Sequence, residues 1–279
     1  MKKMIWILII LLVPIIYVAT AFVPSFLAER GYLRDELGDF TVVGHRGGAS
    51  LGPENTLTCI ERGIEAGAEM IEIDIHLTKD GQLIVCHDQT VDRTTDGRGR
   101  IRDLTLAEIK RLHVVYQGKT TDETLPTLDE VLDLVDGRCD LLIEIKRTGN
   151  IYQGIEQKML ETVRAHNAKS WVVVQSFNDS VLENTHRLDP SVRLEKLIVM
   201  KFPGLPFIFD TSFSRFSFEK YSYIESFNFF YGAVNRSLID DIHAHKREVK
   251  LWTLDERSKA PHWPIDGIIT NRPDDWQPE

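Results

Sequence analysis

Four short motifs bring histidines, carboxylates and cations to the ends of apolar, strand-like runs. In chain order they are His45-Arg46-Gly47, Glu72-Ile73-Asp74, His87-Asp88 and Glu144-Ile145-Lys146. Carboxylates bind hard divalent cations, histidines exchange protons near neutral pH, and arginine and lysine bind phosphate oxygens. The motifs together indicate metal-assisted cleavage of a phosphate ester.

Three carboxylates are the candidate metal ligands. Glu72 and Asp74 lie two residues apart in the alternating run Met70–Leu77, which places both on one face of a strand. With Glu144 from another strand they offer three oxygen ligands, a set that suits one Ca²⁺ or Mg²⁺. Burial of three negative charges without a cation would be costly. His76 shares their face, and we expect it only to support the site.

His45 and His87 are the candidate acid and base, because the ordinary pKa of histidine lets one accept a proton while the other donates one. The sequence does not decide which histidine does which. Arg46 and Lys146 are the candidate phosphate ligands, although Lys146 can equally pair with a metal-site carboxylate. Trp252 can pack against the carbon skeleton of a substrate or belong to the core.

Strand-like and helix-like segments alternate from residue 40 onward, which predicts a parallel α/β fold. Because the polar motifs recur at strand ends, we expect a (β/α)8 TIM barrel rather than an open doubly wound sheet. The segment 92–122 breaks the alternation and is expected to be an insertion after the strand that ends at His87. The expected strands are 40–44, 70–77, 82–86, 140–145, 171–177, 194–199, 223–227, 249–254 and 267–270. The expected helices are 55–66, capped by Asn55, and 106–112, 128–135, 151–166, 180–188 and 237–245.

The N-terminus predicts a membrane segment. Residues 1–3 are basic after Met1, and the run 4–23 contains no charged residue and is long enough to span a bilayer. A connector, 24–39, then leads to the catalytic domain, 40–279. The run is long for a signal-peptide core, which favours a single-pass anchor, and the basic start places the domain outside the cytoplasm. A signal peptide cleaved near Ala19-Thr20-Ala21 is the alternative, giving a secreted or periplasmic protein.

Composition limits the partners. The net charge of −9 argues against a nucleic-acid partner, because phosphate backbones select basic surfaces. The three cysteines, Cys59, Cys86 and Cys139, have no metal-binding or redox spacing, and we expect them to be small apolar side chains rather than a disulfide. The sequence does not predict an oligomeric state.

From about residue 41 onward, the chain resembles the glycerophosphodiester phosphodiesterase family. The resemblance rests on the four motifs and on these further stretches: Glu54-Asn55-Thr56, Thr78-Lys79-Asp80-Gly81, Asp92-Arg93-Thr94-Thr95, Pro126-Thr127-Leu128, Ser176-Phe177, Trp252-Thr253 and Asp266-Gly267-Ile268-Ile269-Thr270. It implies a TIM barrel with a small insertion after His87, with His45 and His87 as acid and base. It also implies a divalent cation on Glu72, Asp74 and Glu144, and phosphate contacts from Arg46 and Lys146.

The leading hypothesis is hydrolysis of glycerophosphodiesters to an alcohol and glycerol 3-phosphate. A lysophospholipase D acting at the membrane is the alternative, and an inactive barrel that binds lipid headgroups is a third. The chain departs from the family pattern in two places. Segment 255–264 is too short and proline-rich for a last helix, and segment 202–231 is unusually aromatic. The aromatic segment can pack against the barrel, or form an apolar rim that accepts an acyl chain or touches the bilayer.

Overall fold

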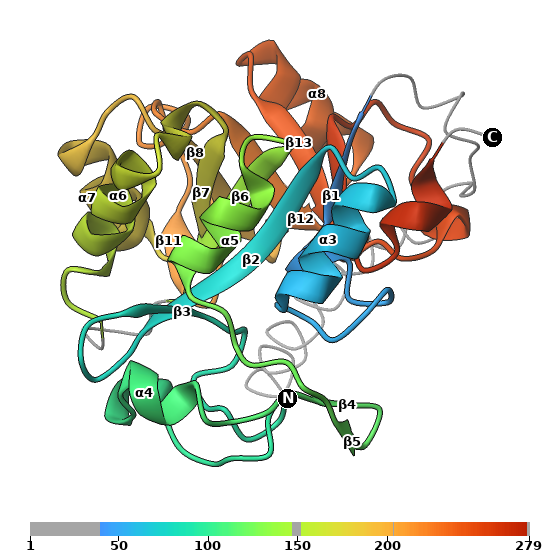
Figure 1. Ribbon diagram of the computed structural model, residues 1–279. Coiled ribbons are helices and arrows are strands. Elements are labelled where there is room, and N and C mark those ends of the chain that lie inside the picture. Colours follow the sequence, from blue (N-terminus) through green and yellow to red (C-terminus); the bar gives the residue numbers. More distant parts are fainter. Residues whose placement is uncertain (1–39, 147–151, 203, 278–279) are drawn as a thin grey trace, which may run out of the picture.

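Eight parallel strands close into a barrel at the centre of the molecule (Figure 1). The computed structural model describes residues 40–146, 152–202 and 204–277. Each barrel strand pairs with the next in chain order, and β1 pairs with both β14 and β2 to close the ring. This confirms the TIM barrel and excludes the open sheet. The strands are β1 (Thr41–Gly44), β2 (Met70–Leu77), β6 (Asp140–Ile145), β7 (Val172–Ser176), β8 (Arg193–Ile198), β12 (Ser226–Phe230), β13 (Glu248–Trp252) and β14 (Gly267–Thr270).

The two faces of the strands have different chemistry. On β2 the residues Ile71, Ile73 and Ile75 join the large apolar core between the barrel and its helices. Glu72 and Asp74 alternate with them and therefore face the barrel interior. A small apolar layer closes the interior beneath the polar motifs; it consists of Val43, Met70, Leu142, Val173 and Ile269.

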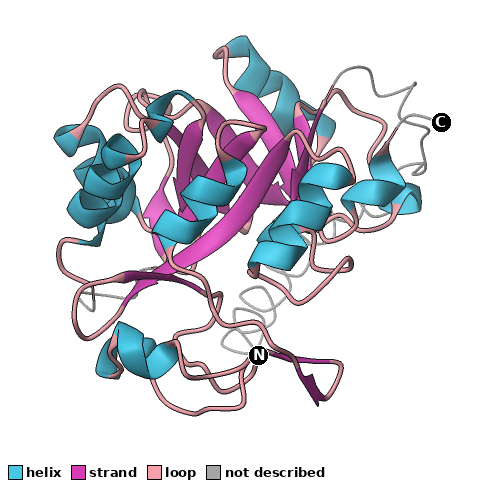
Figure 2. Ribbon diagram, in the orientation of Figure 1, coloured by secondary structure: helices cyan, strands magenta, loops and turns pink. Residues whose placement is uncertain are grey.

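Helices ring the strands (Figure 2). They are α3 (Leu57–Glu65), α5 (Leu128–Val135), α6 (Ile155–Ala165), α7 (Asp179–Leu188) and α8 (Arg236–Ala244). Thr127 and Glu130 form a capping box at the start of α5, which explains why that helix begins where the sequence predicted. The expected cap of the first helix was wrong. Thr56, not Asn55, accepts the backbone N–H of Cys59 at the start of α3, and Asn55 has a left-handed φ of 58°.

The strand expected at 82–86 is not a barrel strand. Its structured part, β3 (Leu83–Val85), runs antiparallel to the end of β2. A tight turn at residues 78–81 reverses the chain, so β3 returns toward the barrel mouth instead of crossing over to start a new parallel strand. His87 therefore reaches the mouth from outside the barrel.

The strand expected at 223–227 begins three residues later, as β12. Tyr221 and Ile224 are buried apolar residues, as residues of a strand would be. They lie, however, in the turn that precedes β12. Inside β12 the polar Asn228 faces other polar groups of the barrel interior and weakens the strand pattern.

The excursion after β3 lies outside the barrel, below the end of β2 in Figure 1. It carries a short helix, α4 (Leu106–Ile109), and a small hairpin of β4 (Val115–Tyr116) and β5 (Lys119–Thr120). A separate apolar cluster holds it together, formed by Ile84, Cys86, Val91, Ile101, Ile109, Val114 and Leu125. The break in periodicity thus corresponds to a unit with its own small core.

Two of the crossovers contain no α-helix within the described residues. Between β13 and β14 there is only a short 3-10 turn, Arg257–Lys259, as the prolines predicted. Between β8 and β12 lies a three-stranded antiparallel unit of β9 (Met200–Lys201), β10 (Phe207–Phe209) and β11 (Phe213–Arg215). Phe216 is buried against Tyr221 and Phe227, whereas other aromatic side chains of this segment are exposed.

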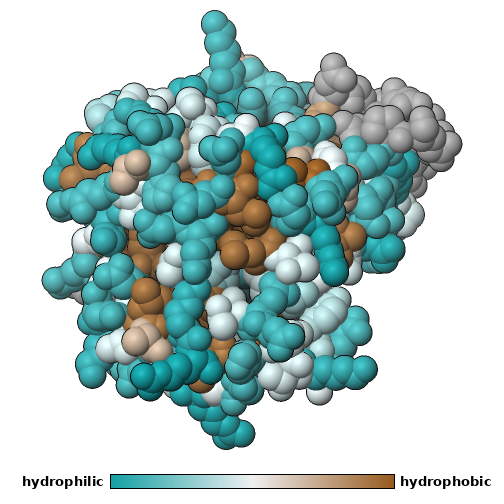
Figure 3. All heavy atoms as spheres, in the orientation of Figure 1, coloured by the Kyte–Doolittle hydropathy of each residue, from teal (hydrophilic) through white to brown (hydrophobic). Residues whose placement is uncertain are grey.

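The expected membrane segment 4–23 and the connector 24–39 lie outside the described residues. Within residues 40–146, 152–202 and 204–277, no helix is both long and apolar enough to cross a membrane. All three cysteines are free, with Cys59 and Cys86 buried, as expected. On the face shown in Figure 3, hydrophilic residues dominate and apolar ones show only in patches between them.

Candidate functional site

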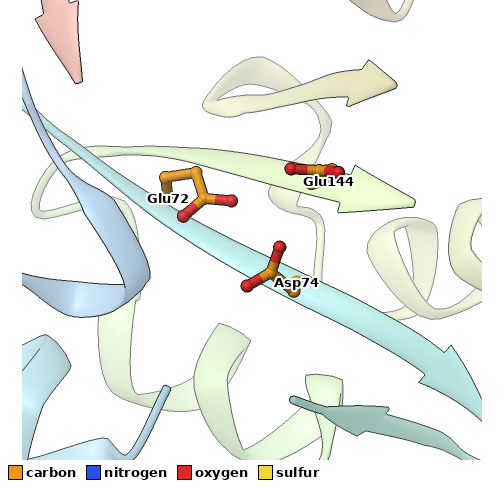
Figure 4. Close-up of side chains that lie close together, drawn as sticks. All are labelled: Glu72, Asp74 and Glu144. Atoms are coloured by element: carbon orange, nitrogen blue, oxygen red, sulfur yellow. The ribbon is translucent and has the colours of Figure 1, made fainter. Parts of the chain in front are cut away.

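Three carboxylates from two neighbouring strands converge inside the barrel mouth. Glu72 and Asp74 come from β2 and Glu144 from β6, and Asp74 lies directly beside Glu144 in the sheet register (Figure 4). One oxygen of each lies within 4.8 Å of the others, and all three residues are buried. This is the cluster predicted from the sequence as the metal site.

Among the described residues, two buried oxygens of the cluster have no hydrogen-bond partner, Glu72 Oε1 and Asp74 Oδ1, and the second of them has an ion pair with Lys146. Glu72 Oε2 accepts the backbone N–H of Arg46 at 2.8 Å, but the buried Oε1 has no hydrogen-bond partner among the described residues. Asp74 Oδ2 accepts from Asn55 Nδ2 at 2.9 Å, and Lys146 Nζ lies 3.0 Å from Asp74 Oδ1 and 2.7 Å from Glu144 Oε1. The orphaned oxygen fits a group that donates no hydrogen bond, such as a cation.

The electrostatics point the same way. Burial, with the nearby charges of Asp74 and Glu144, raises the pKa of Glu72 well above its ordinary value. Burial also raises the pKa of Glu144. For Asp74, burial opposes ionisation, but the positive charges of Lys146, His87 and Arg46 outweigh it and lower the pKa. One lysine thus compensates only part of the negative charge, and a divalent cation would compensate the rest.

The turn after β1 presents Arg46 to this cluster. Arg46 and Gly47 both have left-handed backbone angles, with φ of 53° and 88°. The turn is packed so tightly under α3 that a Cβ at Gly63 would lie 2.2 Å from the carbonyl oxygen of Gly47. A glycine at position 63 therefore lets the turn come close enough for the N–H of Arg46 to reach Glu72.

His45 is held in one tautomer. Its Nδ1 donates to Asn271 Oδ1 at 2.7 Å, and Asn271 Nδ2 donates to Asp255 Oδ2 at 2.9 Å, which fixes the amide with its oxygen toward the ring. The lone pair of a neutral His45 therefore resides on Nε2. Burial, helped by the charge of Arg46, lowers the pKa of His45 to about 4.

His87 is held from two sides. The backbone N–H of Cys86 donates to Asp74 O at 2.9 Å, and His76 Nε2 donates to the carbonyl oxygen of His87 at 3.1 Å. The Nδ1 of His87 donates to Asp88 Oδ1 at 2.7 Å. Burial lowers the pKa of His87, while Asp74 and Asp88 act in the opposite direction. His76 thus supports the site through the backbone of His87 and also lines the cavity.

A chain of ion pairs connects the two histidine motifs. Arg93, from the excursion after β3, donates to both oxygens of Asp88 and to both oxygens of Glu54. Glu54 Oε1 in turn accepts from Arg46 Nη1 at 2.9 Å. His87 and Arg46 are therefore positioned by one shared guanidinium, although they lie far apart in the sequence.

A cavity of about 330 Å³ opens beside the cluster. Trp252 does not line it. Its indole N–H donates to Asn228 O at 2.9 Å, its ring packs over the inner apolar layer, and it contacts the cavity residue Phe177 edge-on at 5.6 Å. The cavity is lined by His76, His87, Gln89, Glu144, Ile145, Lys146, Ser176, Phe177, Asn178 and Thr211.

All the other residues singled out from the sequence lie at or beside this mouth. Sequence reasoning missed Asn55 as a partner of Asp74 and Asn271 as a partner of His45. Asn271 follows directly after β14, so the strand-end rule that found the other residues could have found it. Thr211 arrives from the hairpin between β8 and β12, and no local signal predicts its position.

Comparisons with known proteins agree with the motifs. The sequence model of the glycerophosphoryl diester phosphodiesterase family matches residues 45–275. The chain is 36% identical over 241 residues to a glycerophosphodiester phosphodiesterase of Caldanaerobacter subterraneus subsp. tengcongensis, covering 84% of this chain and 94% of the relative. It is 31% identical over 241 residues to a glycerophosphodiester phosphodiesterase of Bacillus altitudinis, covering 84% and 95%.

Solved structures share the fold. A phosphodiesterase of Oleispira antarctica, in complex with the product sn-glycerol-3-phosphate, matches with a TM-score of 0.71 at 24% identity, covering 85% of this chain and 95% of that one. A glycerophosphodiester phosphodiesterase of Agrobacterium tumefaciens matches with a TM-score of 0.69 at 23% identity, covering 84% and 98%. On the strength of the family match and the relatives above 30% identity, the chain is an enzyme that belongs to the glycerophosphoryl diester phosphodiesterase family.

Proposed function

We propose that the protein hydrolyses glycerophosphodiesters to an alcohol and glycerol 3-phosphate, with one divalent cation, Ca²⁺ or Mg²⁺, held by Glu72, Asp74 and Glu144. The observation that carries the proposal is the buried carboxylate cluster with its unpaired oxygen, set between two oriented histidines. The names of the relatives and the product complex of the Oleispira protein support the substrate class.

The cation, when bound, supplies positive charge to phosphate oxygens and stabilises negative charge that develops on them. Arg46 directs its guanidinium to the same place from the turn after β1, held there by Glu54. Lys146 holds Asp74 and Glu144 in register and adds a point charge at the cavity wall. The cavity wall is mixed, with the polar side chains of Gln89, Ser176 and Asn178 beside the apolar Ile145 and Phe177.

We assign the base to His45 and the acid to His87. The amide of Asn271 keeps the proton of His45 on Nδ1, so Nε2 is free to accept one from the attacking hydroxyl. Asp88 stabilises the protonated ring of His87, which can then donate to the leaving alcohol from Nε2. The attacking group is either water or a hydroxyl of the glycerol itself.

Two substrates that differ in their leaving group test this assignment. An alkyl alcohol such as choline needs a proton from an acid when it leaves, whereas p-nitrophenolate does not. His87→Ala should lose activity on glycerophosphocholine by about 10²–10⁴-fold but keep much more of it on the p-nitrophenyl diester. His45→Ala should lose both. The opposite pattern would exchange the two roles, and full activity in His45→Ala would contradict the catalytic assignment.

The dependence of activity on a divalent cation is tested separately. A panel of glycerophosphodiesters is treated with enzyme in EDTA, then with Ca²⁺ or Mg²⁺ added back separately. We expect activity to disappear in EDTA and to return with one of the ions, and the panel ranks the headgroups. Undiminished hydrolysis in EDTA, or by Glu72→Ala, would argue against a metal on this cluster. An inactive barrel is disfavoured because every motif position is filled.

The second candidate activity is that of a lysophospholipase D. We also propose that the protein is located at a membrane. Exposed aromatic side chains beside the cavity and the uncharged run 4–23 favour it. The run is either a single-pass anchor with the domain outside the cytoplasm or a cleaved signal peptide. Comparison of glycerophosphocholine with lysophosphatidylcholine separates the two activities. Membrane fractionation with an alkaline wash, followed by sequencing of the mature N-terminus, separates the two fates of the run.

A further inference from the structure

We propose that the hairpin between β8 and β12 is a membrane-docking surface for anionic lipid, and that it brings the mouth of the active site to the bilayer. The docking surface consists of Leu205, Phe207 and Phe213, with Lys201 and Arg215 beside them. The docking itself is independent of the proposed reaction. Only its benefit for a bilayer-held substrate rests on the proposed function.

The first support is a concentration of exposed apolar side chains. Phe213 is 75% exposed, Phe207 46% and Leu205 45%, and Leu188 at 37% is the one other exposed large hydrophobic residue in the part of the chain that the structure describes. Three of these four thus fall within nine residues. The ring of Phe213 stacks on Phe202 at 5.7 Å and lies 5.5 Å from Phe209, so the exposed edge belongs to an ordered aromatic cluster. Such a patch marks a contact surface.

The second support is how firmly the hairpin is seated. Ile208, between the exposed rings, is fully buried in the main core. Asp210 lies 2.7 Å from Nζ of Lys196, a buried lysine of β8, which also lies 2.9 Å from Asp179. An ion pair buried at this place fixes the hairpin to the barrel wall. The exposed rings are therefore held outward by the fold.

The position of the hairpin ties the surface to the active site. Thr211, in the turn between β10 and β11, lines the catalytic cavity together with His87, Lys146 and Phe177. The turn is only two residues from the most exposed ring, Phe213. A surface that receives the hairpin therefore lies beside the opening through which a substrate enters.

The charges on the hairpin favour an anionic lipid surface as its partner. The chain carries a net charge of −9, yet the hairpin presents the exposed Arg215 and the half-buried Lys201, while its one carboxylate, Asp210, is buried against Lys196. No ion pair of Arg215 or Lys201 with another described residue is found. Aromatic and aliphatic side chains flanked by cations are typical of proteins that bind the interface of anionic membranes.

A bilayer fits better than a second copy of the chain. Three side chains provide far less than the roughly 800 Å² per partner that a stable protein interface needs, and two copies with a net charge of −9 repel each other. As an uncleaved anchor, the uncharged run 4–23 would hold the protein at a membrane. Fully extended, the connector 24–39 would span at most about 58 Å, which would keep an anchored domain close to the same surface.

A fluorescent probe tests the docking directly. The full chain with Cys139→Ser carries an environment-sensitive nitrobenzoxadiazole label on Phe213→Cys, and a matched protein carries it on Leu188→Cys at the opposite end of the barrel. We expect vesicles of equal parts phosphatidylglycerol and phosphatidylcholine to shift the emission of the label at 213 to the blue and to protect it from an aqueous quencher, with no change at 188. Water-like emission at 213 in these vesicles would overturn the proposal. So would a blue shift without lipid that grows with protein concentration, because it would indicate a second copy.

Kinetics provide the second readout. Phe207→Ser with Phe213→Ser should lower the rate on bilayer-held lysophosphatidylcholine by about tenfold or more, since less apolar surface enters the membrane. The rate on soluble glycerophosphocholine should stay unchanged, and Leu188→Ser should change neither. Equal losses on both substrates would contradict a docking role. If the wild-type protein cleaves neither substrate, the proposed function fails while the probe still decides the docking.

Discussion

At the level of single residues, the unpaired oxygen of Glu72 makes stability depend on the metal. Burial and the neighbouring carboxylates raise the pKa of Glu72 well above 4.5 in the folded protein. Without metal, the stability that comes from its protonated form is complete below about pH 4.5 and is lost as the pH rises through the higher folded-state pKa. A bound cation removes this penalty because it neutralises the ionised form.

Glu72→Gln should therefore separate metal binding from folding. In EDTA, the melting temperature of the variant should rise relative to that of the wild type as the pH goes from about 5 to about 8, because glutamine has no charge to bury. Added Ca²⁺ or Mg²⁺ should stabilise the wild type and have much less effect on the variant. Differential scanning calorimetry measures both effects, with the exposed Glu65→Gln as control. Equal stabilisation of all three proteins by metal would place the ion elsewhere.

Arg93 is a positioning residue, because it touches neither the cavity nor the metal cluster but binds the carboxylates that hold His87 and Arg46. Its hydrogen bond is the main reason that the pKa of Asp88 is lowered to about 2. Loss of the guanidinium would free both carboxylates at once and let both functional side chains move.

We expect Arg93→Gln to lower kcat by about 100-fold with a smaller change in KM, since small misplacements of catalytic groups cost rates of that order. Arg93→Lys should restore only part of the loss, because an ammonium cannot bridge two carboxylates with a planar fork. Steady-state kinetics with the exposed Arg98→Gln as control measure this. A complete rescue by lysine would show that charge alone, not geometry, is needed.

At the level of elements, strong local signals in the sequence predicted helices and strands well. The strand pairings made where the chain reverses direction were not predicted. The alternation of Met70–Leu77 and the helical run 128–135 gave element boundaries that the structure reproduces. β3 failed as a barrel strand because a short apolar run looks the same in parallel and antiparallel pairing. The partners Asn55 and Arg93 could not be predicted, because their contacts depend on how the turn after β1 and the excursion after β3 meet in space.

The close contact between α3 and the turn after β1 gives a prediction at this scale. A Cβ at Gly63 would lie 2.2 Å from a backbone oxygen of Gly47, so either the helix or the turn must shift. Gly63→Ala should move Arg46 away from Glu72, lower kcat/KM by about 100-fold and destabilise the protein by about 1–3 kcal/mol. Gly52→Ala is the control, because its nearest neighbour is a flexible Arg62 side chain at 3.4 Å. Wild-type kinetics in Gly63→Ala would show that the turn tolerates the shift.

At the level of the whole molecule, the barrel interior changes from charge to hydrocarbon to charge along its axis. The catalytic carboxylates occupy the mouth, and the apolar layer around Leu142 and Val173 lies beneath them. A second buried polar group connects the strands β8, β12 and β13. In it, Glu195 lies 2.7 Å from Lys250 Nζ and accepts a hydrogen bond from Asn228 Nδ2 at 2.7 Å. Asn228 also donates to Gln175 of β7 at 3.0 Å, and none of these four side chains lines the cavity.

The inner ion pair should therefore affect stability without affecting chemistry. Lys250→Met would leave Glu195 charged and buried with only Asn228 as a partner, which should cost about 3–5 kcal/mol of unfolding free energy. The double variant Glu195→Gln with Lys250→Met should recover much of that loss, because the glutamine carbonyl still accepts from Asn228 without a charge to compensate. Urea unfolding measures the stability, and the exposed Lys119→Met should leave the midpoint unchanged. At temperatures where the variants stay folded, their kcat should match that of the wild type, since neither side chain lines the cavity. A stable Lys250→Met protein with impaired kcat would instead couple this inner group to the catalytic mouth.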